Sequence, residues 1–305
     1  MDLAVARRRR AISTPQRQEV LAGYLFALPA ILVLAIFLVV PIIASIGLAF
    51  TDYPLLKPPR WIGLENLRRL VADSRMVRCY GNTFTMAFGE VILANLLGLL
   101  LAMGANRKMP RVVAYLFRTA YFFPVLTTTA TLALVWQYLL TRDRGIINWL
   151  LGTIGIAPIP WLSSSQWAIV SVIIYGVWKS CGMWMVMYLA GLQGIPETLY
   201  EAARIDGASR WRLTRHITLP LVTPTAFFCL VMSGTGAFQA FDNVYVLTDG
   251  GPGDASRSIA LYIYEVAFKR YEMGYASTVA LSLMIVLIAL TLLQFYGGRR
   301  WVHYE

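Results

Sequence analysis

Three charged side chains lie inside long apolar stretches of the sequence: Glu90, Lys179 and Asp242. A charge in apolar surroundings is costly unless it is paired or faces a cavity, so each is a candidate functional residue. We expect Glu90 to be paired within a helix bundle or against a partner helix, and Asp242 to make a fixed hydrogen bond near the outer end of its helix. Lys179 is a candidate ligand contact, and its ammonium group would favour an anionic or strongly hydrogen-bonding ligand.

Other kinds of chemistry are missing from the sequence. The glycine-rich run at residues 250–253 is followed by neither Lys nor a helix-forming stretch, so there is no phosphate-binding loop. The three cysteines are scattered and show no metal-ligand spacing. His216 and His303 are isolated, and we assign both to the solvated surface. The sequence therefore predicts no catalytic residue, no metal site and no cofactor bound by this chain.

The segments that must position these residues are long and apolar. Of the 305 residues, 58% are hydrophobic and 14% charged, and the mean hydropathy is +0.60. An ordinary soluble domain is about 45–50% apolar and about 25% charged. A helix needs about 20 mostly apolar residues to cross about 30 Å of hydrocarbon. Six segments meet this requirement: 24–50, 83–103, 120–140, 167–192, 221–247 and 276–295. The sequence thus predicts an all-α integral membrane protein with six transmembrane helices.

An even number of helices places both termini on one side of the membrane. If that side is the cytoplasm, the inside connections carry a net charge of +9 and the outside connections +3. This is a modest agreement with the positive-inside rule, and we expect both termini to be cytoplasmic. The arginines at residues 7–10 resemble the start of a signal peptide, but the apolar stretch after them is too long for a cleaved one. The total charge of +11 accompanies no recognition motif, so no nucleic-acid partner is predicted.

The two longer outside connections, residues 51–82 and 141–166, each show the pattern of a short surface helix. Apolar residues recur at helical spacing through residues 64–71 in the first and 146–151 in the second. Such helices would cap an outward-facing opening. An equally weighted alternative is that they lie at the membrane interface and anchor the bundle through Trp61, Trp149 and Trp161.

The inside connection at residues 193–220 predicts two short helices separated by a break. Pro196 suits the first turn of a helix, and Gly207 can take the left-handed conformation that ends it. Ser209 would then cap the second helix. A lever made of two short helices suits docking into a groove on another protein. More commonly, however, such a loop only lies at the membrane interface.

This connection also contains a set of residues at a specific spacing: Glu201, Ala202, Ala203, Asp206, Gly207 and Ala208, followed by Ile217, Thr218, Leu219, Pro220 and Pro224. The set resembles the EAA loop of binding-protein-dependent ABC importer permeases. Leu213 departs from the pattern, since an aromatic residue is common there, but it keeps the apolar character. The resemblance implies that the six residues from Glu201 to Ala208 couple this chain to an ATPase.

A second run, FDNVYVLTDGGP at residues 241–252, is similar to the outer end of helix five in the carbohydrate-uptake branch, which includes the maltose permease. The resemblance implies a solute site between helices four and five, at the positions of Lys179, Ser180, Met183, Ser233, Gly236, Ala237 and Ala240. The last four fall on one helical face. A face of small residues also permits tight helix packing, so both interpretations stay open.

The resemblance implies a permease subunit of an ATP-driven importer of a sugar or related solute, such as an oligosaccharide, a polyol or a glycerol phosphate. The expected partners are a second, different permease subunit, a dimer of ATP-binding subunits that uses ATP and Mg²⁺, an extracytoplasmic solute-binding protein and membrane lipid. The expected location is the plasma membrane of a bacterium or archaeon.

We expect a permease core at residues 78–297 that contains the coupling loop 193–220. Residues 1–77 would form a cytoplasmic tail, the first helix and an outer loop, and residues 298–305 a cytoplasmic tail. The alternative function is an ion-coupled secondary transporter, but the paired buried carboxylates and internal repeat of that class are missing. A membrane enzyme would need a nucleophile–base pair, which is also missing.

Overall fold

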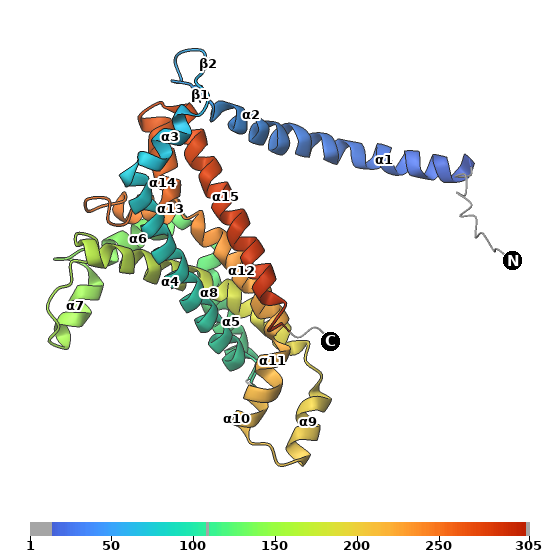
Figure 1. Ribbon diagram of the computed structural model, residues 1–305. Helices are drawn as coiled ribbons and strands as arrows, with labels where there is room; N and C mark the ends of the chain where they lie inside the picture. Colours follow the sequence, from blue (N-terminus) through green and yellow to red (C-terminus); the bar gives the residue numbers. More distant parts are fainter. Residues whose placement is uncertain (1–13, 108–109, 303–305) are drawn as a thin grey trace.

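The computed structural model describes residues 14–107 and 110–302. The arginines at residues 7–10 and His303 lie outside the described residues. The prediction of an all-α membrane protein is confirmed, since helices dominate the fold (Figure 1). Four described helical segments are long and apolar enough to cross a membrane: Leu21–Leu48, Ser74–Ala105, Ser165–Gln193 and Met273–Gly298. Two sharply bent helix pairs bring the number to six if each pair is one span.

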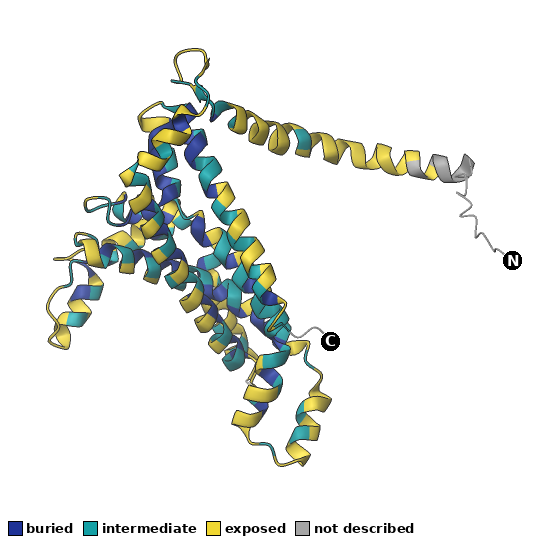
Figure 2. Ribbon diagram, in the orientation of Figure 1, coloured by how far each residue is buried: buried dark blue, intermediate teal, exposed yellow. Residues whose placement is uncertain are grey.

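The first span forms an arm that leaves the rest of the molecule. It consists of α1 (Thr14–Leu34), a π-helical turn (Ala35–Val39) and α2 (Val40–Leu48). Figure 1 shows the arm extending away from the bundle, and Figure 2 shows that its side chains are exposed over most of its length. An apolar helix without protein around it requires lipid or another protein to cover it.

One end of the bundle, which the charge distribution predicts to be the outer one and which we call the outer end, carries short elements. A two-residue hairpin pairs β1 (Thr51–Asp52) with antiparallel β2 (Arg60–Trp61), and α3 (Glu65–Ala72) follows it. The second outside connection contains α7 (Ile146–Thr153). Both predicted surface helices are therefore present. Trp161 is buried and donates to Asn148 Oδ1 at 2.9 Å, so it does not anchor the protein at the membrane surface.

The bundle is built on the packing of α4 (Ser74–Ala105) against α8 (Ser165–Gln193). Small residues bring these helices together, because a Cβ atom at Gly98 would lie 2.7 Å from the Cβ atom of Trp184. The last helix, α15 (Met273–Gly298), runs along the length of the bundle (Figure 1). The interior is thus close-packed, as protein cores are.

The third predicted span is not one straight helix. The chain forms α5 (Arg111–Leu126) and α6 (Thr129–Leu139), whose axes differ by 103°. Pro124 lies in the last turn of α5, where its ring removes a backbone donor and favours an end to the helix. The expectation of a continuous helix at 120–140 is therefore corrected.

The fifth predicted span is also interrupted. It consists of α11 (Leu219–Leu221), α12 (Thr223–Phe238) and α13 (Asp242–Thr248), with a break at residues 239–241. Asp242 begins α13, so its predicted place near the outer end of a continuous helix is wrong. After α13 the chain forms α14 (Ile259–Tyr264) and a π-helical turn (Glu265–Lys269) before α15.

Candidate functional site

The three charged residues of the apolar segments lie around one cavity of about 250 Å³ at the break between α12 and α13. Five of the seven residues predicted for the substrate pathway line it: Lys179, Ser180, Gly236, Ala237 and Ala240. The other lining residues are Glu90, Thr129, Tyr175, Gly176, Gln239, Phe241, Asp242 and Asn243. The cavity therefore brings charged, amide and aromatic groups together.

Glu90 extends from α4 toward α8, where Gly176 makes room for its carboxylate. A Cβ atom at position 176 would lie 2.4 Å from Glu90 Oε2, so only glycine allows this approach. Ser180 Oγ donates to Glu90 Oε1 at 3.5 Å, which is a weak hydrogen bond. The expected pairing of Glu90 within this bundle is limited, among the described residues, to that contact.

Lys179 has a structural role that the sequence did not indicate. Its Nζ atom donates to the backbone oxygen of Pro124 at 3.0 Å and to that of Thr127 at 2.9 Å. Carbonyls at the end of a helix have no partner inside the helix, and α5 ends at this point. Lys179 therefore stabilises the bend between α5 and α6 while it lines the cavity.

Met183 and Ser233, which were also predicted for the substrate pathway, are not among the residues that line the cavity. Ser233 is buried and accepts a hydrogen bond of 2.9 Å from Asn95 Nδ2. Tyr188 OH donates to Asn95 Oδ1 at 3.2 Å, so this polar network connects α4, α8 and α12. Ser233 thus holds helices together, whereas the rest of the small-residue face borders the cavity.

Some residues of the cavity were not predicted for the site, including Gln239 and Asn243 at the helix break and Tyr175 on α8. The signal for the break was the Asp242–Asn243 pair, because Asp and Asn favour the start of a helix. Tyr175 OH donates to the backbone oxygen of Thr129 at 2.6 Å. No local pattern marks Tyr175, since its partner comes from another helix.

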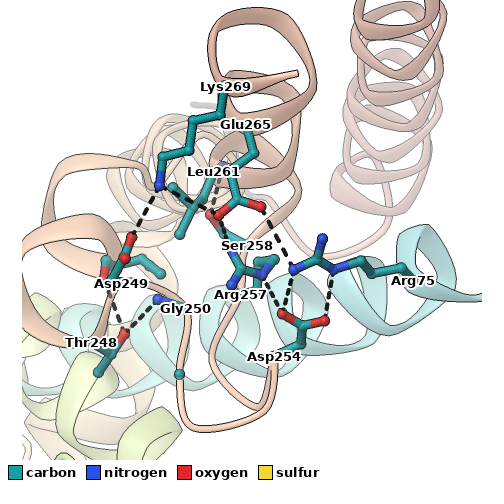
Figure 3. Close-up of polar contacts among 12 residues, drawn as sticks. Arg75, Thr248, Asp249, Gly250, Asp254, Arg257, Ser258, Leu261, Glu265 and Lys269 are labelled. Carbon is teal, nitrogen blue, oxygen red and sulfur yellow. Dashed lines mark hydrogen bonds and ion pairs between the residues drawn. The ribbon is translucent and has the colours of Figure 1, made fainter. Parts of the chain in front are cut away.

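The turn after α13 is fixed by a group of ion pairs that we call the outer cluster: Arg75, Asp254, Arg257 and Glu265 (Figure 3). Arg75 Nε and Nη2 donate to the two carboxylate oxygens of Asp254 at 2.7 and 2.8 Å. Arg257 also donates to Asp254, at 2.5 Å, and to Glu265. The hydrogen bonds from Arg75, together with the one from Arg257, hold the pKa of Asp254 well below its ordinary value despite its partial burial.

The outer cluster is connected to the cavity through a few hydrogen bonds. Asn82 Nδ2, on α4, donates to the backbone oxygens of Asp254 and Arg257. Ser258 Oγ donates to the backbone oxygen of Ala240 at 2.8 Å, at the helix break itself. The ion pairs therefore fix the outer wall of the cavity to the start of α4.

At the opposite end of the bundle, residues 193–220 form the predicted lever of α9 (Glu197–Ile205) and α10 (Arg210–Leu213), which continues into a π-helical turn (Thr214–Thr218) (Figure 1). Gly207 has φ +77°, the left-handed conformation expected of it. The amide of Ala208 donates to the oxygen of Ala203 at 2.9 Å, which closes the end of α9. Ser209 caps α10 by accepting from the amide of Arg212.

The predicted coupling residues lie on this lever, and most are exposed. Glu201, Ala202, Asp206 and Gly207 are exposed, while Ala203 and Ala208 are half-buried. Two apolar side chains beside them are also open to solvent, with Ile205 87% and Trp211 67% exposed. A groove of about 700 Å³ separates the lever from the inner end of α4. The lever thus presents an apolar surface with few internal contacts, which is typical of a docking site.

The chain is similar to a known protein family and to several known proteins. Residues 94–302 match the family described as the binding-protein-dependent transport system inner membrane component. The chain is 35% identical to the probable ABC transporter permease protein YurN of Bacillus subtilis over 91% of this chain and 96% of that protein. It is 31% identical to the trehalose/maltose transport system permease protein MalF of Thermococcus litoralis over 92% of this chain and 95% of that one.

A solved structure has the same architecture. It is a bacterial ABC transporter involved in the import of the acidic polysaccharide alginate, with a TM-score of 0.82 and 25% identity over 94% of this chain and 98% of that chain. These relatives are transport subunits or transporters, and none of those named here is an ion-coupled secondary transporter. The chain therefore belongs to the family of binding-protein-dependent transport system inner membrane components and is a multi-pass permease subunit of an ABC transporter.

Proposed function

We propose that this permease imports a sugar or related solute across the plasma membrane of a bacterium or archaeon, by alternating access through the cavity at the α12–α13 break. The relatives named for trehalose/maltose and for alginate transport support this solute class. The cavity supports it too, because carboxylate, amide and aromatic groups are the groups that hold hydroxyl-rich ligands. The main observation in support of the proposal is that the α9–α10 lever is exposed at one end of the same bundle.

The lever is the proposed contact with a dimer of ATP-binding subunits, through Glu201, Ala202, Ala203, Asp206, Gly207 and Ala208. A ligand shifts a conformational equilibrium only by binding one state better than the other. Nucleotide-driven closure of the ATPase dimer would supply that difference by moving two docked levers relative to each other. This chain then needs no cofactor, because ATP and Mg²⁺ are used by the ATPase.

A second homologous permease is the proposed partner within the membrane, forming a heterodimer. The arm from Leu21 to Leu48 supports this, since it leaves its own bundle with its apolar surface uncovered (Figure 2). Lipid would cover the remaining apolar surface. The arm joins β1 at the outer end of the bundle. Because the arm crosses the membrane once, its other end lies on the cytoplasmic side.

The outer face is the proposed docking surface for an extracytoplasmic solute-binding protein. The β1–β2 hairpin, α3 and the outer cluster lie at that end, opposite the lever (Figure 1). The described end of α15 lies near α11 and α12, toward the lever side (Figure 1). Both termini would thus be cytoplasmic, as the charge distribution favours.

Copurification and reconstitution test the proposal. The tagged chain, expressed with the genes that neighbour it, is expected to copurify with an ATPase and a second permease. In proteoliposomes, ATP hydrolysis should rise when the solute-loaded binding protein is added, and uptake should require ATP. Uptake driven by a proton or sodium gradient in the absence of the ATPase would instead show an ion-coupled secondary transporter.

A further inference from the structure

Glu90 is a carboxylate that faces the cavity without a basic partner. Among the described residues, no Lys or Arg nitrogen forms an ion pair with it, and its one side-chain donor is Ser180 at 3.5 Å. A structural carboxylate inside a bundle is expected to be well paired, since an unpaired polar group there is costly. The position of Glu90 therefore indicates that another molecule supplies its hydrogen bonds.

Lys179 does not neutralise this carboxylate. Two of the three donors of its ammonium group are used by the oxygens of Pro124 and Thr127, which direct it toward the bend between α5 and α6. Asp242, at the start of α13, adds a second carboxylate to the lining and is exposed. The charged groups of the lining are thus two carboxylates and one ammonium group that is already engaged.

The packing around Glu90 keeps its carboxylate in place. Gly176 is buried, and the space that a side chain at this position would fill is occupied by the carboxylate of Glu90. Both oxygens and the carboxyl carbon lie within 3 Å of the position that a Cβ atom would take. The glycine and the glutamate therefore form a matched pair across α4 and α8 that fixes an acceptor at the cavity wall.

Resting on the proposed function, we propose that Glu90 determines specificity: it accepts hydrogen bonds from hydroxyl or amino groups of the solute and disfavours solutes that carry a carboxylate, sulfonate or phosphate. Two like charges in a cavity of low dielectric repel each other more strongly than in water. The chain would therefore select uncharged or amino-bearing polyhydroxyl solutes, in contrast to the structural relative that imports an acidic polysaccharide. This narrows the proposed solutes by removing glycerol phosphate.

The test uses the whole reconstituted importer and three radiolabelled disaccharides of the same size: one neutral, one with a 2-amino group and one with a uronic acid. The binding protein is the same in every assay, so a change in the uptake ratio between variants comes from the permease. Wild-type protein should transport the neutral and amino compounds in preference to the uronic acid. Glu90→Gln should raise the ratio of uronic acid to neutral uptake by about tenfold and lower that of the amino compound.

Two further variants keep the test decisive if Glu90→Gln fails to fold. Asp242→Asn removes an exposed carboxylate of the same lining and should shift the ratio in the same direction by a smaller factor. Glu19→Gln removes an exposed carboxylate of α1, outside the cavity and outside the proposed docking surfaces, and should leave the ratio unchanged. Unchanged ratios in folded Glu90→Gln and Asp242→Asn proteins would overturn the inference. ATP-independent uptake by the wild type would instead overturn the proposed function.

Discussion

The lever at the inner end and the cluster at the outer end of this bundle are built in opposite ways. The lever has exposed apolar side chains and a groove behind it, and its helices are held by a few local hydrogen bonds. The outer cluster has arginines and carboxylates that join residues far apart in the sequence, such as Arg75 and Asp254 (Figure 3). The lever is exposed and available to a partner, whereas the residues of the outer cluster bind one another.

This difference indicates how the two ends contribute to transport. A segment that docks on a partner needs surface that its own protein leaves uncovered, and few internal contacts favour that. A segment that shapes a cavity has to keep its geometry, and ion pairs that are joined to helix ends favour that. Substitutions should therefore separate activity from stability: lever variants should lose transport while remaining folded, and outer-cluster variants should lose stability.

The largest effect on transport is expected from Gly207→Val. A Cβ atom at this position would meet nothing within 4 Å, so the substitution acts through the backbone angle φ +77°. A β-branched residue in that conformation costs about 1–2 kcal/mol and would redirect α10 relative to α9. We expect the protein to insert and its thermal unfolding midpoint to fall by only a few degrees, while ATP-dependent uptake in proteoliposomes is abolished.

Gly207→Asn is the matched control, because Asn tolerates the left-handed conformation better than other residues with a side chain. It should keep most of the transport activity. Gly104→Ala, in α4, adds a Cβ atom to another open position without a positive φ and should have little effect. Full uptake by Gly207→Val would show that the lever does not couple this chain to the ATPase.

The second-largest effect is a loss of folding stability, which we expect from Arg257→Met. Arg257 is 8% exposed and pairs with both Asp254 and Glu265. Its removal leaves the buried Glu265 with ion pairs of 3.8 Å to Arg75 and Lys269, and it takes away one of the two arginines that hold Asp254. Breaking a buried ion pair in this way typically costs about 3–5 kcal/mol. We expect a large fall in the thermal unfolding midpoint in detergent, with the lever still able to bind the ATPase in a copurification assay.

Arg144→Met is the control for charge alone, since Arg144 is exposed and lies in another outer connection. Its unfolding midpoint should match that of the wild type. Arg257→Met could instead be as stable as Arg144→Met and yet inactive in transport. The outer cluster would then take part in the conformational change, which contradicts the structural role given to it here.

The sequence was sufficient for features that depend on neighbouring residues. Gly207 was expected to end a helix and Ser209 to cap the next, and both do, because turn and capping preferences act over three or four residues. The surface helices α3 and α7 followed from apolar spacing in the same way. Four of the six predicted apolar segments also lie in continuous helices of membrane length, since lipid requires long apolar helices.

The features that decide the shape of the cavity were not predicted, because they depend on contacts between distant segments. The break at residues 239–241 lies within a stretch that is apolar enough for one helix, and hydropathy alone does not interrupt it. Lys179 was a candidate ligand contact, and its hydrogen bonds to backbone oxygens at the end of α5 were not predicted. Arg75 and Asp254 are 179 positions apart, so no local pattern connects them.

The smallest of the expected effects concerns Asp73, which caps α4 beside the outer cluster. Its carboxylate accepts hydrogen bonds from Tyr262 OH at 2.5 Å, Tyr275 OH at 2.6 Å and the amide of Arg75 at 3.0 Å. Burial acts to raise the pKa of Asp73, but these hydrogen bonds together hold it below its ordinary value of 3.8. Asp73→Asn should lower the free energy of unfolding by about 2 kcal/mol at pH 7, because hydrogen bonds to a charged group are lost.

The pH dependence of unfolding distinguishes this role from simple packing. Because the pKa of Asp73 is lower in the folded protein, its contribution to stability is complete above pH 3.8 and is lost as the pH falls through the lowered folded pKa. The wild-type unfolding midpoint should therefore stay level near neutral pH and fall below about pH 4, whereas that of Asp73→Asn should fall less steeply there. Equal slopes for the two proteins would show that Asp73 is not held as a carboxylate, and that the outer end is fixed by the arginine pairs alone.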